Sequence, residues 1–377
     1  MFVSDRGSEI GHQPAPEAWP LVAISILNWN GWKDTLECLE SVRQLDYPNY
    51  LTLVADNGSW DDSTQRIKDW AGRKLGEGNL LGDYDRATAL QGGKEQAEQA
   101  LDQVSSPGRL VLIRNEENLG FAGGNNVTIH YALSRRNPAD FVLLLNNDAT
   151  VSPNCLTRLV ETLQKTKAGM AEAAIFQAGA QAPEGPWIPP HWQIQFERFF
   201  GEEMGPFLAR DNYQEVIAAH GSAMIMRSEM LRAVFSAKGE YLHERFFMYL
   251  EDVGISVRAQ KLGYRCIRVN DAVVWHKGAA SSGGKYNCRE YYYSHRNALL
   301  LSRELSRAGW FIVRVMNLPR TLGRVAKNII YRRFVAAHAI VSGLIDGYCG
   351  VDGKWKQHDR GRSLDRTSEN KTEESQE

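Results

Sequence analysis

What the chain lacks excludes several classes of protein. Its 377 residues have a formal net charge of −1, so the basic field that nucleic-acid binding needs is missing and we expect no nucleic-acid partner. The five cysteines are scattered and contain no Cys-x-x-Cys pair: Cys38, Cys155, Cys266, Cys288 and Cys349. Such a set gives neither a zinc motif nor a disulfide framework and suits a reducing compartment.

Long apolar runs are also missing. The first twenty residues hold charges, Pro and Gly without an apolar core, so we expect no signal peptide. The longest candidate for a membrane span, residues 334–345, contains His338 and Ser342 and is shorter than the roughly 20 apolar residues that a spanning helix needs. These absences predict a cytoplasmic protein.

Strand-like and helix-like segments alternate along the first half of the chain. Four apolar runs have the length and composition of buried strands: residues 21–27, 51–55, 110–113 and 141–145. Segments with helical character lie between and after them: residues 32–45, 61–70 and 154–165. This alternation predicts an α/β fold with a mostly parallel, doubly wound sheet. We interpret residues 72–108 as an insertion with a helix over 94–104.

The second half is less regular. Residues 168–213 are rich in Pro, Gly and aromatics, and order returns at 218–226, followed by a helix from Ser228. We expect a helix over 251–262, separate strands over 265–269 and 272–275, and mostly helix over 288–346. The predicted organisation is a flexible leader (1–19), a catalytic domain (20–287) with a nucleotide-binding half to about 150, a basic helical extension (288–350) and a disordered tail (351–377).

The most informative motif is Asn146-Asn147-Asp148, which follows the apolar run 141–145. In open α/β sheets, ligands bind at the carboxyl ends of the strands. A carboxylate flanked by two amides at such a place offers hard oxygen ligands to a divalent cation that also holds a diphosphate. The alternative is an Asx turn without a ligand.

Four further motifs accompany it. They are Asp56-Asn57-Gly58-Ser59 after the second strand, the Gly-rich residues 118–126 after the third, the pair Glu251-Asp252, and His276 after the last strand. In this order the set resembles the family 2 glycosyltransferases of the GT-A fold, a nucleotide-diphospho-sugar transferase fold. The closest likeness is to the rhamnosyltransferase-like branch that builds cell-surface polysaccharides. The resemblance extends over about residues 20–300.

The resemblance implies a donor site on the first half of the chain. Asp56 would bind the nucleotide base, since a carboxylate can accept from the imide N–H of uracil or thymine, and Asn28 would lie beside the base or ribose. Residues 118–126 would approach the diphosphate and sugar, and glycines there would let backbone come close to the ligand. The residues concerned in that segment are Asn118, Gly120, Gly123 and Asn125. Both Asp56 and the 118–126 segment retain a turn without ligand as the alternative.

The resemblance also implies a metal site. Asn147 and Asp148 match the family's Asp-x-Asp motif, in which this chain has Asn146 in place of the first Asp, so Asp148 supplies the only carboxylate. His276 matches the histidine that completes the site from a distant strand. The implied cofactor is a divalent cation, Mn²⁺ or Mg²⁺, and imidazole favours Mn²⁺. A purely structural His276 is the alternative.

Glu251 and Asp252 match the acidic pair at the start of the family's acceptor-side helix. By that likeness Asp252 is the base that takes the proton of the attacking acceptor hydroxyl, with Glu251 beside it. The metal would stabilise charge on the departing diphosphate. Helix capping by two acids is the alternative.

Three regions beyond the motifs could take part. Arg296, in a Tyr-rich segment that resembles one in this branch, could reach the diphosphate or an acceptor phosphate, or form an ion pair on a helix surface. Aromatic residues over 187–200 could line the acceptor cleft or pack a core. Residues 302–340 combine eight basic residues and one acid with interleaved apolar side chains. They fit either an anionic membrane surface or a solvated helical face.

The expected function is therefore inverting, metal-dependent hexosyl transfer from a nucleotide-diphosphate sugar, favoured as dTDP-rhamnose, to a cell-envelope glycan or lipid-linked acceptor. The expected place is the cytoplasm, either free or peripheral on the inner face of the membrane. A UDP-hexose-dependent enzyme of the same fold and a catalytically weak glycan-binding member remain alternatives. A dinucleotide-binding oxidoreductase is excluded, because Asn28-Trp29-Asn30-Gly31 stands where Gly-x-Gly-x-x-Gly would follow the first strand. The loop of a nucleotidyltransferase is missing there as well.

Overall fold

A computed structural model of the chain describes residues 19–75, 80–179, 212–278 and 288–356. The predicted leader, apart from Trp19, lies outside these residues. So do the aromatic stretch over 187–200 and the tail beyond residue 356.

A ten-stranded sheet forms the centre of the molecule, with the order β3-β4-β2-β1-β5-β9-β7-β10-β6 and β8 paired to β10. The strands are β1 (Val22–Asn28), β2 (Tyr50–Asn57), β3 (Leu80–Asp85), β4 (Leu110–Asn115), β5 (Phe141–Asn146), β6 (Ala149–Val151), β7 (Met170–Gln177), β8 (Tyr213–Glu215), β9 (Ala223–Arg227) and β10 (Cys266–His276). Strands β3, β4, β2, β1 and β5 are parallel, as are β7 and β10, whereas β9, β8 and β6 run antiparallel to their partners. The predicted α/β fold with a mostly parallel sheet is confirmed.

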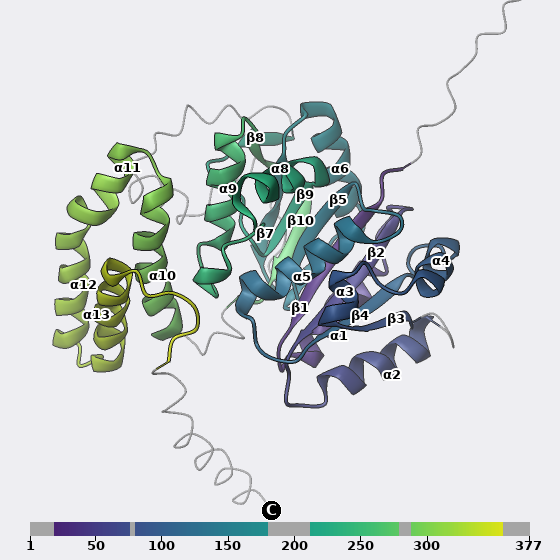
Figure 1. Ribbon diagram of the computed structural model, residues 1–377, viewed down its shortest axis with the longest axis horizontal. Coiled ribbons are helices and arrows are strands. Elements are labelled where there is room, and N and C mark those ends of the chain that lie inside the picture. The colour runs from purple at the N-terminus through teal and green to yellow at the C-terminus, as the bar shows by residue number, and fades with distance from the viewer. Residues whose placement is uncertain (1–18, 76–79, 180–211, 279–287, 357–377) are drawn as a thin grey trace, which may run out of the picture.

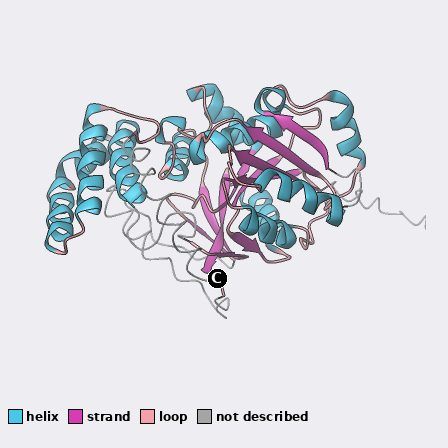
Figure 2. Cartoon of the chain, turned by 90° about the horizontal axis from the view of Figure 1, so that it is seen from below, coloured by secondary structure: helices cyan, strands magenta, loops and turns pink. Residues whose placement is uncertain are grey.

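Helices cover both faces of this sheet (Figures 1 and 2). One core lies between the sheet and α1 (Trp32–Val42), α2 (Ser63–Leu75) and α6 (Cys155–Thr166). The other lies between the sheet and α4 (Glu95–Gln103), α5 (Gly120–Ser134), α8 (Ser228–Lys238) and α9 (Glu251–Lys261). Because both faces are covered, β1, β2 and β5 are almost wholly buried, and this explains their unbroken apolar runs.

A group of helices lies beside one end of the sheet (Figure 1). It consists of α10 (Cys288–Leu301), α11 (Arg307–Phe311), α12 (Leu318–Ile330) and α13 (Phe334–Cys349), with short turns η2 (Ser302–Glu304) and η3 (Ile312–Met316). α10 packs against α13 and buries Leu299, Leu300 and Ile340. In the described part of the chain, none of the helices is both long and apolar enough to cross a membrane. The domain boundaries remain a prediction.

Several expectations about single elements are wrong. Residues 72–108 are not merely an insertion, because β3 pairs in parallel with β4 and forms an edge of the sheet, followed by the short α3 (Arg86–Leu90). An edge strand tolerates Gly82 and the acids Asp83 and Asp85. Because these residues are not typical of a buried strand, β3 was not predicted from the sequence. The strand β7 lies inside residues 168–213, which were expected to be irregular. It is rich in alanine, so its sequence lacks the pattern of large apolar residues that indicates a strand.

The last strand also differs from expectation. Residues 265–269 and 272–275 belong to one strand, β10, whose register against β7 shifts between Val269 and Val273. Asn270 and Asp271 lie at this irregularity, and their polarity suggested a break in the strand. Residues 149–151, which were not predicted as a strand, form β6 and pair with the end of β10.

Candidate functional site

The site lies at the carboxyl ends of the central strands. The parallel registers place Asn28 opposite Asp56 and Leu27 opposite Asn146, so that the ends of β2, β1 and β5 are level. Asp148 follows β5 directly. Three segments that lie far apart in the sequence therefore meet at one edge of the sheet, as expected for parallel strands.

Asp56 is held in a defined orientation. Its Oδ1 accepts from Asn28 Nδ2 at 2.7 Å and its Oδ2 from the Ser59 backbone N–H at 3.1 Å. Asn28 is fully buried, and its own Oδ1 accepts from Thr35 Oγ1 at 2.8 Å. The bond from the Ser59 N–H is the one expected if Asp56 only stabilises a turn. This geometry is compatible both with that role and with base binding. Base binding by Asp56 and Asn28 stays a prediction.

Two tryptophans beside Asp56 were missed in the sequence. The rings of Trp29 and Trp60 pack edge to face with centroids 5.2 Å apart, and Trp60 is 62% exposed. Trp29 directly follows β1 and Trp60 lies three residues after the end of β2, and this placement in the sequence was the available signal. An exposed aromatic face at this position can stack on a planar base.

The strand pair β6–β10 brings Asp148 and His276 together. His276 pairs with Ala149, and Asp148 Oδ1 lies 3.0 Å from His276 Nε2. Asn146 Nδ2 lies 3.2 Å from the same ring nitrogen. Asn147 turns the other way, toward α1, and donates to Thr35 Oγ1 at 3.1 Å. The two residues predicted as metal ligands are thus adjacent, with Asn146 as a third neighbour.

The donor set at this place fits a divalent cation. The described residues contain no group of three or more His, Cys, Asp or Glu side chains that could hold a metal ion. Asp148 and His276 nevertheless converge, and the Oδ1 of Asn146 is buried without a hydrogen-bond partner. One carboxylate, one imidazole and one amide oxygen suit Mn²⁺ or Mg²⁺ when a diphosphate supplies further oxygens.

The acidic pair at the start of α9 is connected to this edge by residues 220–222. Asp252 Oδ2 accepts from the Gly221 N–H at 3.0 Å, and the Ser222 carbonyl accepts from the Asn146 N–H at 2.9 Å. Asp252 is half-buried, whereas Glu251 is buried and its Oε2 lacks a partner. Burial, aided by the charge of Asp252, raises the pKa of Glu251 well above its usual value. Of the two acids, Asp252 is the more accessible to solvent, and its role as the base stays a prediction.

His220 is a further residue at the site that sequence reasoning missed. Desolvation lowers the pKa of its ring, with the charge of Asp252 acting in the opposite direction and that of His276 in the same direction. Its backbone N–H donates to Glu172 Oε2 at 2.6 Å, and Glu172 forms a fully buried ion pair with Arg268. A glutamate in the alanine-rich β7 was the available signal. The charges of Asp252, the predicted base, and of His276, a predicted metal ligand, thus both act on the His220 ring.

The segment 118–126 contains the start of α5, whose first amides donate hydrogen bonds within the chain. Asn118 Oδ1 accepts from the Gly120 N–H at 2.8 Å, and the first free amides of α5, those of Phe121 and Ala122, donate to the Phe247 carbonyl at 2.6 and 3.3 Å. Gly120 has a φ of 74°, and a Cβ there would collide with that carbonyl. The helix start is thus capped by the chain itself, which argues against phosphate binding by these amides.

Two other predicted donor contacts in this segment are not supported by the geometry. Asn125 is buried, accepts from Ser25 Oγ at 3.0 Å and donates to the Phe121 carbonyl at 3.0 Å. A Cβ on Gly123 would press against Leu119, so this glycine allows close packing within the helix. Contacts of Gly120, Gly123 and Asn125 with the sugar donor stay a prediction.

Arg296 does not point to a ligand either. It is fully buried, and its guanidinium nitrogens donate to Asn297 Oδ1 and to the carbonyls of Arg245, Phe246 and Gly353. The prediction that Arg296 reaches a phosphate is not supported by this geometry, because every nitrogen already donates within the chain. Its exposed ion pair, the alternative, is wrong because the residue is not on the surface.

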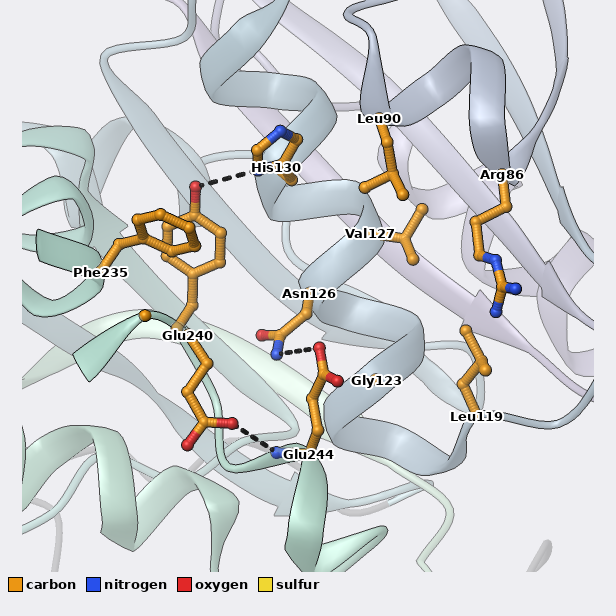
Figure 3. Close-up of a pocket in the computed structure, with 12 residues that line it drawn as sticks. Arg86, Leu90, Leu119, Gly123, Asn126, Val127, His130, Phe235, Glu240 and Glu244 are labelled. Atoms are coloured by element: carbon orange, nitrogen blue, oxygen red, sulfur yellow. Dashed lines mark hydrogen bonds between the residues drawn. The ribbon is translucent and has the colours of Figure 1, made fainter.

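A separate cavity of about 530 Å³ lies on the far side of α5 (Figure 3). Its lining includes the rings of His130, Phe235 and Tyr241, which pack against one another, and the acids Glu240 and Glu244. Glu244 accepts from Asn126 Nδ2 at 2.9 Å, and Glu240 pairs with Arg258. None of the predicted ligand-contacting residues except Gly123 lines this cavity, so it is distinct from the strand-end site.

Comparisons with known proteins agree with this geometry. The sequence profile of a family described as "Glycosyltransferase like family 2" matches residues 88–291, more than half of the chain. A low-salt glycan biosynthesis hexosyltransferase of Haloferax volcanii is 27% identical over 219 residues, covering 53% of this chain and 67% of that protein. An uncharacterised protein of Mycobacterium tuberculosis is 26% identical over 217 residues, 55% of this chain and 70% of its own length.

The fold has solved counterparts. A mannosyltransferase from Pyrobaculum calidifontis, solved in complex with GDP-Man and Mn²⁺, superposes with a TM-score of 0.54 over 89% of each chain at 14% identity. At this identity the likeness concerns the fold alone, and it identifies the sheet and its helices as the GT-A arrangement.

Proposed function

This chain belongs to the glycosyltransferase-like family 2, and from that membership we propose that it is an inverting, metal-dependent hexosyltransferase. The donor is a nucleotide-diphosphate sugar, and the acceptor is a hydroxyl of a cell-envelope glycan or a lipid-linked glycan. The observation on which the proposal rests is the convergence of Asp148 and His276 at the strand ends that also carry Asp56.

The proposed chemistry is a single displacement. Asp252 takes the proton of the acceptor hydroxyl while that oxygen bonds to the anomeric carbon and the bond from this carbon to the diphosphate breaks. Asp148 and His276, with Asn146, would hold the divalent cation, which supplies positive charge beside the departing diphosphate. Burial, with the charge of Asp252 acting in the same direction, raises the pKa of Glu251, so this acid loses its proton less readily than an exposed glutamate.

The favoured donor is dTDP-rhamnose, on the likeness of the motifs to the rhamnosyltransferase-like branch. Asp56 supports a base with an imide N–H, which thymine and uracil share, so a UDP-hexose is the runner-up. The Haloferax relative is named a hexosyltransferase, which agrees with the coarser class. A catalytically weak glycan-binding member is favoured only by Asn146, and the geometry of Asp252 and Asp148 argues for an active enzyme.

A donor panel tests the proposal most directly. The purified chain is incubated with dTDP-rhamnose, UDP-glucose, UDP-N-acetylglucosamine and GDP-mannose, each with Mn²⁺ and a mixture of bacterial lipid-linked glycans. We expect release of nucleoside diphosphate from one donor, dependent on acceptor. Release with none of the donors, or equal release without acceptor, would contradict the proposed transfer.

The surface of the C-terminal helices supports a membrane-bound acceptor. Large apolar side chains are exposed there: Phe311, Met316, Leu322, Ile329, Ile330, Phe334 and Val335. Exposed basic residues lie among them: Arg307, Arg320, Arg324, Lys327 and Arg332. As part of the proposal, this basic apolar surface binds the anionic inner face of the cell membrane, because its basic residues are attracted to anionic lipid. The same positive charge opposes contact with a second copy of this surface.

A further inference from the structure

The loop directly before the proposed base has an unfavourable backbone. Phe247, Tyr249 and Leu250 all have positive φ, at 65°, 67° and 68°, although none is glycine. Phe247 is the centre of a tight γ-turn, in which the Met248 N–H donates to the Phe246 carbonyl at 2.7 Å. L-residues adopt such angles only when surrounding contacts hold them there.

This loop, residues 246–250, touches both halves of the proposed site. The carbonyl of Phe247 caps α5 on the donor side by accepting from the Phe121 and Ala122 amides. The carbonyl of Leu250 accepts from the Gly254 N–H at 2.9 Å and so begins α9, whose second residue is Asp252. The shape of the loop therefore sets where α9 starts relative to α5.

Two adjacent buried residues of α10 hold the loop. Asn297 Nδ2 lies 3.1, 2.8 and 2.8 Å from the carbonyl oxygens of Phe246, Met248 and Tyr249. Arg296 donates to the Phe246 carbonyl at 2.8 Å, and its Nε donates to Asn297 Oδ1 at 2.9 Å, which fixes the amide in the donating orientation. One side-chain pair thus binds the carbonyls that the irregular backbone turns inward.

The environment of Arg296 is unusual for a cation. It is 0% exposed, and the partners that the structure gives it are neutral: backbone carbonyls, the Asn297 amide, and the rings of Tyr292 and Tyr293 at 5.2 and 4.8 Å. Burying a charge without a carboxylate is costly unless hydrogen bonds compensate for the lost solvation, and each guanidinium nitrogen of Arg296 donates such a bond. The conformation that these bonds impose is that of the 246–250 loop.

We propose that Arg296 and Asn297 are positioning residues for the transfer reaction, which hold the 246–250 loop so that Asp252 faces the acceptor hydroxyl. They touch neither substrate nor metal. This inference rests on the proposed function for the role of Asp252, but the holding of the loop is independent of it.

Hydrogen–deuterium exchange tests the holding of the loop. The variant Asn297→Leu keeps the volume and removes all three donated bonds, and Arg296→Lys keeps the charge but not the fork of donors. Asn328→Leu is the matched control, because Asn328 is a buried asparagine of α12 whose side-chain amide donates to the Arg324 carbonyl of the same helix at 2.9 Å. We expect faster exchange over residues 246–254 in the first two variants and unchanged exchange there in the control. Unchanged exchange in Asn297→Leu would overturn the inference.

Steady-state kinetics test the positioning of the base. Misplacement of a reacting group by about 1 Å can cost about 100-fold in rate. We expect Asn297→Leu to lower kcat by about that factor with an unchanged KM for the donor and unchanged nucleoside diphosphate affinity, since Asp56 and Asp148 lie outside the 246–250 loop, at the ends of β2 and β5. Asn328→Leu should retain kcat.

The outcomes separate the two proposals. Faster loop exchange with wild-type kcat would overturn the positioning role, as would an equal fall of kcat in Asn328→Leu. If the wild-type chain transfers no sugar from any donor while Asn297→Leu still loosens the loop, the proposed function fails and the holding of the loop stands.

Discussion

Asp148 Oδ1 and His276 Nε2 lie 3.0 Å apart because the three-residue strand β6 pairs with the last residues of β10. The antiparallel register that sets His276 against Ala149 leaves Asp148 beside the imidazole. The carbonyl of Asp148 also accepts from the Lys277 N–H at 3.0 Å, which fixes the two chain segments on both sides of the pair. This contact brings the β5 end and the β10 end into one site.

Chelation should stop the reaction. Because Asp148 and His276 converge with Asn146 as a donor set for a divalent cation, we expect EDTA to abolish transfer and Mn²⁺ to restore it. Asp148→Ala and His276→Ala should each weaken metal-dependent binding of nucleoside diphosphate and lower kcat by about 100-fold or more. Calorimetry with and without Mn²⁺ measures the binding. Full turnover in excess chelator would contradict the metal site.

Replacement of Asp252 should separate chemistry from binding. The variant Asp252→Asn keeps the shape and can still accept from Gly221, but it cannot take a proton, so we expect kcat to fall by about 10²–10⁴-fold. Nucleoside diphosphate affinity should stay nearly intact, because the base acts only as the acceptor attacks. Loss of nucleotide binding together with retained turnover would refute the assignment.

Glu251 should make stability depend on pH. Burial holds its folded-state pKa above its unfolded value, so between the two values the folded state binds more protons and stability falls as pH rises. Each unit of this shift costs about 1.4 kcal/mol once both states are ionised. We expect Glu251→Gln to increase the free energy of unfolding at pH 8 more than at pH 4.

Chemical denaturation at several pH values measures this effect. Glu161→Gln serves as the control, since Glu161 is half exposed on α6. Parallel pH profiles for Glu251→Gln and the wild-type chain would show that Glu251 ionises normally in the folded protein.

The C-terminal helices should bind anionic vesicles. Attraction of a basic residue to an anionic surface is worth about 1 kcal/mol and is screened by salt. Co-sedimentation with phosphatidylglycerol vesicles should therefore fade as salt rises. Replacement of four residues by Gln should release the protein from the vesicles and leave transfer to a soluble acceptor unchanged. These residues are Arg320, Arg324, Lys327 and Arg332. Equal sedimentation with neutral and anionic vesicles, or none with either, would leave this surface as an ordinary protein face.

Much of the fold could be predicted from the pattern of apolar residues. The runs 21–27, 51–55, 110–113 and 141–145 correspond to β1, β2, β4 and β5, because strands covered on both faces must be apolar throughout. The strands that were missed, β3, β6, β7 and β8, are an edge strand, an alanine-rich strand and two strands of three residues each. Their residues have little apolar contrast, and only pairing with neighbours makes them strands.

The sequence by itself determined which chemical groups follow the strands: Asp56, Asp148, Asp252 and His276 are single side chains at the ends of regular elements. Tertiary structure decided what each can do. It placed His276 beside Asp148, buried Glu251 but left Asp252 half-exposed, and turned Arg296 inward to the 246–250 loop. The physical reason is that burial and hydrogen-bond partners come from segments distant in the chain, and local residue patterns do not contain them.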